Sequence, residues 1–302
     1  MTQTRFAVSI PQQVADGTFD PGAFRDYLRR AEELGFHSAW TRESVLAPSP
    51  LPMLSPMETM TYAAACTERL RIGCAVFISV VHSPLHLAKS ISTLDQLSRG
   101  RLEVGFGLGS RDNLPNFGIS PDGLVSRFTE GIELMKTCWT ESKVAFDGRF
   151  WHVDAAMEPK PYQKPHPPVW IGGHKPAAVR RAVHHGDGFF GAGGSTTAAF
   201  AEQVGIVKDE LARTGRDPGS FGIAKRVYVS VGDEQRISGL LERMYGDASI
   251  AVEGPPETCV RGLREVIQAG ADLVLLDSMF DEPEQLELLA TQVLPELRGN
   301  EG

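Results

Sequence analysis

Short apolar segments alternate with longer segments whose apolar residues recur every three or four positions along almost the whole chain. The first kind is typical of buried strands, and the second is typical of amphipathic helices. Strands are therefore predicted at 6–10, 37–41, 71–78, 102–106, 169–171, 188–190, 222–231 and 272–276. The helices that follow them are predicted to begin near residues 20, 55, 83, 122, 176, 197, 257 and 283. A Ser55–Glu58 capping box is expected at the second of these helix starts.

Regular alternation of strands and helices indicates a parallel sheet, and eight such units favour closure into a (β/α)8 TIM barrel. We expect one barrel domain to span residues 1–302. An open doubly wound sheet is the alternative architecture. The first strand–helix turn lacks the G-x-G-x-x-G fingerprint of dinucleotide-binding sheets of that kind, which favours the barrel.

Residues 142–168 interrupt the alternation and predict an insertion after the fourth βα unit. Asp147-Gly148 stands between two alternating segments, which is a strong hairpin signal. The stretch 159–168 is rich in proline and predicts an extended connector. We interpret both as parts of one insertion in the barrel, without a second domain.

Composition narrows the classes of function. The 302 residues are 42% hydrophobic and 23% charged, which is ordinary for a soluble globular protein. A formal net charge of -8 argues against nucleic acid as the main partner, and no window has the length of a membrane span. The 4 scattered cysteines, together with an N-terminus that lacks a signal peptide's apolar region, predict reduced thiols in a cytoplasmic protein.

In a barrel, ligand-binding groups gather at the carboxyl ends of the strands, where two glycine-rich turns are predicted. Gly172-Gly173-His174 and Gly193-Gly194 each lead from a strand into a helix start. Glycines allow close backbone approach, and a helix N-terminus favours an anion, so these turns are candidates for a phosphate site. The alternative, that the glycines only satisfy tight turns, stays open.

Two further strand ends carry candidate polar groups. Asn113 follows the fourth strand and is a candidate for hydrogen bonding to a heterocycle, or for a place in a solvated loop. Glu43 ends the second strand beside Arg42, as a general acid or base or as half of a structural ion pair. His82 and His86 are separated by Pro84, so no metal site is predicted.

Several stretches resemble the luciferase-like monooxygenase superfamily, especially its deazaflavin-dependent oxidoreductase branch. The resemblance covers roughly Phe6 to Phe190, and the stretches together are highly specific although no single one is. They are AEELGFHSAW (31–40), RLRIG (69–73), SPLHLAK (83–89), TLDQLSRGRL (93–102), PPVWIGG (167–173) and GDG (186–188).

The resemblance implies a barrel, usually dimeric, that binds coenzyme F420 or, alternatively, FMN. It implies a non-prolyl cis peptide bond behind the cofactor ring, which matches Ala75-Val76. It assigns cofactor contact to Asn113 and phosphate binding to the two glycine-rich turns. Two departures stand out: Ser44 occupies the place of a usual histidine, and Ser110 the place of a glutamate of the sugar-phosphate dehydrogenases. Proton handling is then left to Glu43 or to a residue that the sequence does not identify.

The function expected first is hydride transfer between F420 and a small organic substrate. The alternatives are an FMN-dependent monooxygenase supplied by a separate reductase, a metal-free barrel hydrolase or lyase that uses Glu43 with Arg42, and a cofactor-binding protein without turnover. The substrate pocket is expected to involve the loops at 45–54 and 113–121. We expect Gly173→Asp to weaken cofactor binding while leaving the fold intact.

Overall fold

The computed structural model describes residues 3–14, 18–46, 52–232, 237–280 and 282–299. The chain divides into two compact units. Unit 1 comprises Met1–Pro11, Asp20–Trp40 and Gly172–Gly302, and unit 2 comprises Gln12–Phe19 and Thr41–Ile171. The prediction that a single domain spans the whole chain stays a prediction.

Unit 1 is built around a parallel sheet with β9 at its centre. Strand β9 pairs with β8, β10 and β11, and β11 pairs in turn with β1, which pairs with β2. The strands are β1 (Arg5–Ser9), β2 (Ser38–Thr41), β8 (Gly188–Gly191), β9 (Gly222–Val231), β10 (Ala251–Gly254) and β11 (Leu273–Asp277).

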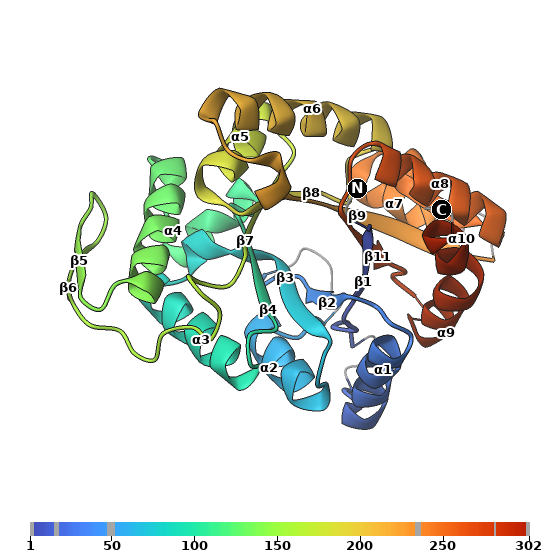
Figure 1. Cartoon of the computed structure of the whole chain (residues 1–302), viewed down its shortest axis with the longest axis horizontal. Helices are drawn as coiled ribbons and strands as arrows, with labels where there is room; N and C mark the ends of the chain where they lie inside the picture. Colours follow the sequence, from blue (N-terminus) through green and yellow to red (C-terminus); the bar gives the residue numbers. More distant parts are fainter. Residues whose placement is uncertain (1–2, 15–17, 47–51, 233–236, 281, 300–302) are drawn as a thin grey trace. The chain divides into compact units, whose positions relative to one another are not determined.

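The helices of unit 1 include α5 and α6, which lie together beside β8 (Figure 1). Figure 1 also shows α7 and α8 beside β9. The helices are α1 (Pro21–Glu33), α5 (Pro176–His185), α6 (Thr197–Thr214), α7 (Ser238–Tyr245), α8 (Pro256–Gln268), α9 (Glu282–Leu288) and α10 (Leu294–Arg298). The predicted C-terminal helix is continuous through a π-helical turn at Leu289–Val293, which joins α9 to α10.

Unit 2 contains the parallel strands β3 (Arg71–Ile78) and β4 (Leu102–Gly107), with β4 also pairing with β7 (Val169–Gly173). Its helices are α2 (Pro56–Cys66), α3 (Pro84–Leu97) and α4 (Leu124–Thr140). The predicted insertion contains the antiparallel hairpin of β5 (Val144–Asp147) and β6 (His152–Ala155), shown in green in Figure 1. A connector without helix or strand follows the hairpin, as the proline-rich stretch predicted.

The central strands of the parallel sheet are buried on both faces, as parallel strands covered by helices must be. Every residue of β4, β8 and β11 is buried, which explains the near-continuous apolar runs of the sequence. The helices bury one stripe each; α8 buries Cys259, Val260, Leu263 and Val266. The 4 cysteines are all buried, and none of them forms a disulfide within the described residues.

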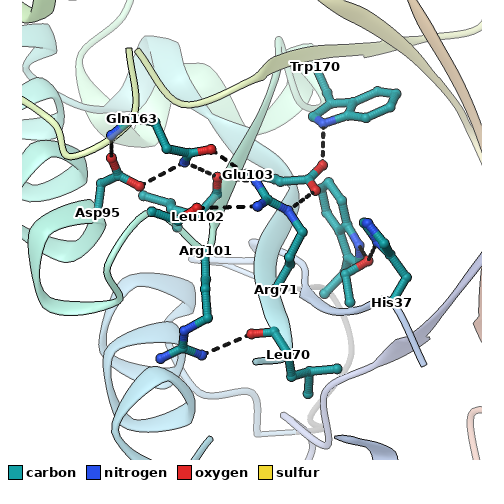
Figure 2. Close-up of polar contacts among 12 residues, drawn as sticks. His37, Leu70, Arg71, Asp95, Arg101, Leu102, Glu103, Gln163 and Trp170 are labelled. Atoms are coloured by element: carbon teal, nitrogen blue, oxygen red, sulfur yellow. Dashed lines mark hydrogen bonds and ion pairs between the residues drawn. The ribbon is translucent and has the colours of Figure 1, made fainter. Parts of the chain in front are cut away.

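A polar network in unit 2 fastens the connector to β3 and β4 (Figure 2). Glu103, 2% exposed, accepts from Arg71 Nε at 2.6 Å and from Trp170 Nε1 at 2.8 Å. Arg71 also donates to Gln163 of the connector, whose amide is held by Asp95 of α3 at 2.8 Å. Glu103 is paired with Arg71, and Asp95 accepts hydrogen bonds from Gln163, so neither buried carboxylate lacks a partner. A carboxylate buried without a partner would be costly.

The same network explains part of the resemblance. Asp95 belongs to the TLDQLSRGRL stretch, and so does Arg101, which donates to the carbonyls of Ala64, Leu70 and Ser98. These side chains hold α2, α3 and the start of β4 together. In this chain the stretch therefore has an architectural role.

The eight parallel βα repeats, formed by β1, β2, β3, β4, β7, β8, β9 and β11, are those of a (β/α)8 barrel, so the predicted fold class is confirmed. Strand β10 was not predicted, because its four residues are too few to show a periodic pattern. The capping box is wrong in detail: the Ser55 hydroxyl binds the Glu58 carboxylate, and no side chain caps α2.

Candidate functional site

Glu43 lies just beyond the carboxyl end of β2 and is almost entirely buried, with 3% of its side chain exposed. One carboxylate oxygen, Oε2, accepts from the backbone N–H of Ile78 at 2.5 Å, and the other, Oε1, lies 2.8 Å from His82 Nε2. The sequence suggested Arg42 as the charged neighbour of Glu43. In the structure the Glu43 carboxylate contacts His82. The prediction that Glu43 handles a proton stays a prediction.

His82 was missed as a partner because it was weighed only as half of a metal pair with His86. It follows β3 and a 3-10 turn at Ser79–Val81, which turn the chain back toward the end of β2. Its imidazole meets the ring of Phe77 edge-on, with centroids 6.4 Å apart, and 32% of the side chain is exposed. The available signal was its place at a strand's carboxyl end, where a barrel gathers its functional groups.

Strand β3 contains the cis peptide bond Ala75-Val76, where the resemblance implied one. The β3–β4 register shifts between Cys74 and Phe77, and β4 carries one glycine within that shift, Gly105, and another just after it, Gly107. A Cβ on Gly105 would lie 2.4 Å from the Cys74 carbonyl oxygen, and one on Gly107 would lie 2.5 Å from Val76 Cγ2. Glycine at both positions therefore permits β4 to approach β3 here. Cofactor contact by Ala75 and Val76 stays a prediction.

Asn113 lies in a 3-10 helix at Arg111–Phe117, after β4. Its amide Nδ2 donates to the carbonyl oxygen of Leu46 at 3.2 Å, so it joins the segments after β2 and β4. Residues 47–51 of the predicted pocket loop lie outside the described residues. A cofactor role for Asn113 stays a prediction.

The first glycine-rich turn leads from the end of β7 to α5. Lys175 is the N-cap residue of α5, and its side chain does not cap the helix. Pro176 has no N–H, and the Ala178 N–H donates to the Lys175 carbonyl oxygen at 2.8 Å, so in the described structure the first turn keeps the Ala177 N–H for a ligand. His174 and Lys175 are both exposed and basic. A Cβ on Gly173 would lie 2.6 Å from the Cβ of Ala178, so the expectation that Gly173→Asp leaves the fold intact is wrong at this turn.

The second turn leads from β8 to α6 and differs from the first because its helix is capped. The Thr196 hydroxyl accepts from the N–H of Ala199 at 3.2 Å. A Cβ on Gly193 or Gly194 would lie 2.7 Å from the ring of Tyr228 or 2.8 Å from that of Tyr245. Close aromatic packing is thus one physical reason for both glycines, and their phosphate role stays a prediction.

Two buried polar residues of unit 1 hold these turns and were not singled out from the sequence. Gln203, 5% exposed, donates through Nε2 to the His174 carbonyl oxygen at 3.3 Å and reaches Ser195 Oγ at 3.4 Å, so it links both turns. Its Oε1 is buried without a hydrogen-bond partner in the described part of the chain. Lys225 of β9, 3% exposed, donates to the carbonyls of Ala192 and Ser195. Burial lowers the pKa of Lys225 to about 7.

Two kinds of feature are absent from the described residues. They contain no group of three or more histidine, cysteine, aspartate or glutamate side chains arranged to hold a metal ion. No helix among them combines the length and the apolar character needed to cross a membrane.

Comparison with known proteins places these features in a family. The sequence model of the luciferase-like monooxygenases matches residues 1–247. An uncharacterised protein of Mycobacterium tuberculosis is 40% identical over 121 residues, covering 39% of this chain and 43% of the relative. The chain thus spans less than half the length of the first curated relatives it matches. An F420-dependent glucose-6-phosphate dehydrogenase of Beutenbergia cavernae is 26% identical over 94% of this chain and 95% of its own.

Solved structures share the fold at low sequence identity. An F420-dependent secondary alcohol dehydrogenase in complex with an F420–acetone adduct has a TM-score of 0.84 at 18% identity, covering 98% of this chain and 99% of that chain. The monooxygenase RslO1 of Streptomyces bottropensis has a TM-score of 0.79 at 24% identity, covering 96% and 99%.

Proposed function

Because the chain belongs to the luciferase-like monooxygenase family, we propose that it is an oxidoreductase that transfers a hydride between coenzyme F420 and a small organic substrate. The observation that carries this proposal is the uncapped N-terminus of α5 behind the exposed His174 and Lys175. Such a site suits the phosphate of a phosphorylated cofactor, since it combines the N–H of Ala177, a favourable helix dipole and the positive charge of Lys175. The near full-length match to an F420-dependent dehydrogenase supports the choice of cofactor.

The residues of unit 1 fit the phosphate of the proposed group at the first glycine-rich turn. Gly173, His174 and the first turn of α5 would hold the phosphate. Gln203 would fix this turn through its hydrogen bond to the His174 carbonyl oxygen. The buried, unpartnered Oε1 of Gln203 is an acceptor to which a ligand hydroxyl or a water could donate. Ring contact by Ala75, Val76 and Asn113 stays what the resemblance implies. The bound cofactor would supply the hydride chemistry, and the protein would supply position and electrostatics.

The direct test is a fluorescence titration of the purified protein with F420 and, separately, with FMN. Tight binding of F420 with weak binding of FMN is the expected result. Preference for FMN would replace the proposal with a monooxygenase that uses reduced flavin and oxygen. Binding of neither cofactor would favour the metal-free hydrolase or lyase instead.

Charge reversal at the first turn tests the phosphate site. His174→Asp and Lys175→Glu should each weaken F420 binding by about ten-fold, because an acidic group near a helix N-terminus competes with the phosphate. Lys208→Glu is the matched control, since Lys208 is an exposed residue of α6 away from the turns. Equal affinities in all three variants would remove this turn from the cofactor site. The homodimer and the cytoplasmic location stay predictions.

A further inference from the structure

Glu43 and His82 form a carboxylate–imidazole pair at the carboxyl ends of β2 and β3, with the carboxylate buried and the imidazole partly exposed. We infer that this pair carries the proton of the reaction, with His82 as the catalytic acid–base and Glu43 as its positioning residue, and that the substrate is an alcohol or the matching carbonyl compound. The inference rests on the proposed hydride-transfer function and names the substrate class for it.

The hydrogen-bond pattern determines which imidazole nitrogen is available. Glu43 Oε2 is occupied by the Ile78 N–H, so the orientation of the carboxylate is fixed by the backbone of β3. An ionised carboxylate only accepts hydrogen bonds, so His82 Nε2, 2.8 Å from Oε1, must carry the hydrogen between them. Nδ1 is then the bare nitrogen, with a lone pair for a substrate hydroxyl.

Burial and exposure divide the roles within the pair. Glu43, with 3% of its side chain exposed and both oxygens engaged, is badly placed to meet a substrate directly. His82 keeps 32% exposure and is the member that a ligand can reach. A buried carboxylate behind an imidazole both sets its tautomer and stabilises the imidazolium, which is the role such a carboxylate has in other enzymes. Ser44, the next residue after Glu43, offers only a hydroxyl.

The proposed step balances for an alcohol. The carbinol C–H bond breaks, and its hydrogen leaves with two electrons as a hydride that reduces the oxidised deazaflavin. The O–H bond breaks, and its proton goes to His82 Nδ1. The carbon–oxygen bond becomes a carbonyl. In reverse, the imidazolium returns the proton to the oxygen of a ketone as the hydride arrives at carbon, so no further reactant is needed.

Glu43→Gln is the most informative variant, because it keeps the size of the side chain. Its amide oxygen can still accept from the Ile78 N–H, which turns the NH₂ group toward His82 Nε2. That nitrogen must then accept, so the proton moves to Nδ1 and the proposed base is lost. His82→Gln removes the base outright. His86→Gln is the matched control, since His86 is an exposed histidine on α3.

The first readout is ¹⁵N NMR of histidine-labelled protein loaded with F420. The imidazole signal that is lost in His82→Gln identifies His82; in the wild type it should show a protonated Nε2 and a bare Nδ1, and in Glu43→Gln the inverse. A wild-type His82 with its proton on Nδ1 would overturn the inference. The inversion tests the hydrogen-bond pattern of the pair, and the turnover measurements test its role in proton transfer.

The second readout is the oxidation of reduced F420 by acetone and by cyclohexanone. Glu43→Gln and His82→Gln should each lower turnover by about 10²–10⁴-fold while F420 affinity is unchanged, and His86→Gln should match the wild type. Wild-type turnover in His82→Gln would overturn the inference. A wild type that binds F420 but reduces neither ketone would overturn it too, while leaving the hydride-transfer proposal standing. A wild type that does not bind F420 refutes the proposed function itself.

Discussion

Lys225→Met should change how stability depends on pH, because Lys225 is a lysine whose charge is disfavoured by burial. The side chain is 3% exposed on β9, and burial, with a smaller effect from the Arg226 charge, lowers the pKa of its ammonium to about 7 from 10.5. Its neutral amine can still donate to the carbonyl oxygens of Ala192 and Ser195.

The sign follows from proton binding in the two states. Below pH 7 the lysine is protonated in both the folded and the unfolded protein, and the folded state bears the full cost of the buried charge. As the pH rises from 7 toward 10.5, the folded protein loses this proton while the unfolded chain keeps it, so stability increases. At about 1.4 kcal/mol for each fully titrated pH unit, the gain between pH 7 and pH 9 is roughly 2 kcal/mol once partial titration near pH 7 is included.

The assay is urea unfolding of the wild type and of Lys225→Met at pH 7, 8 and 9. The wild type should gain roughly 2 kcal/mol of unfolding free energy relative to the variant across this range. Burial raises the pKa of the Cys138 thiol and raises that of Cys259 to about 11, but both thiols are present in both proteins and cancel in the difference. Lys208→Met, at an exposed position on α6, is the control that should leave the slope unchanged. Parallel curves for wild type and Lys225→Met would refute the reasoning.

Two other predictions concern packing and ion pairing. Gly107→Ala should lower the unfolding free energy by about 1–3 kcal/mol in the same urea assay, because its Cβ would meet Val76. Gly205→Ala on α6 should instead raise it by about 0.5–1 kcal/mol, because no neighbouring element lies within 4 Å of the new Cβ. Equal changes in unfolding free energy for these two variants would contradict the close approach of β4 to β3 at Ala75-Val76. Hydrogen bonds from Arg213 and His184 lower the pKa of Glu210 to about 2, so Glu210 stabilises the fold above pH 4.5 and progressively less as the pH falls toward 2. Acid unfolding monitored by circular dichroism should begin at higher pH in Glu210→Gln.

Local patterns sufficed to predict most elements. The strands at Arg71–Ile78 and Gly222–Val231 have the predicted bounds, and the Asp147-Gly148 hairpin is where the alternation indicated it. Strand β10 was missed because four residues in a polar segment carry too little periodicity to be distinguished from a helix or a loop. The resemblance, and no periodicity, pointed to the cis bond at Ala75-Val76.

Part of the candidate site was also available from the sequence, since barrel geometry sends strand ends to one face. That rule selects Glu43, Asn113 and the two glycine-rich turns from the sequence alone. The rule identifies positions along the chain, however, and does not predict which contacts fix each side chain. Gly193 and Gly194 show the difference, because the aromatic rings that exclude a side chain there come from β9 and α7.

By itself the sequence determined the order of strands and helices, the barrel class and the strand ends that carry polar residues. These follow from the spacing of apolar residues, which is a local property of the chain. Only the tertiary structure decided that His82 binds Glu43 and that Gln203 links the two glycine-rich turns. Such pairs lie far apart in the sequence, and their contact depends on how whole elements pack. Side-chain periodicity encodes which face of an element is buried, but not which partner it meets there.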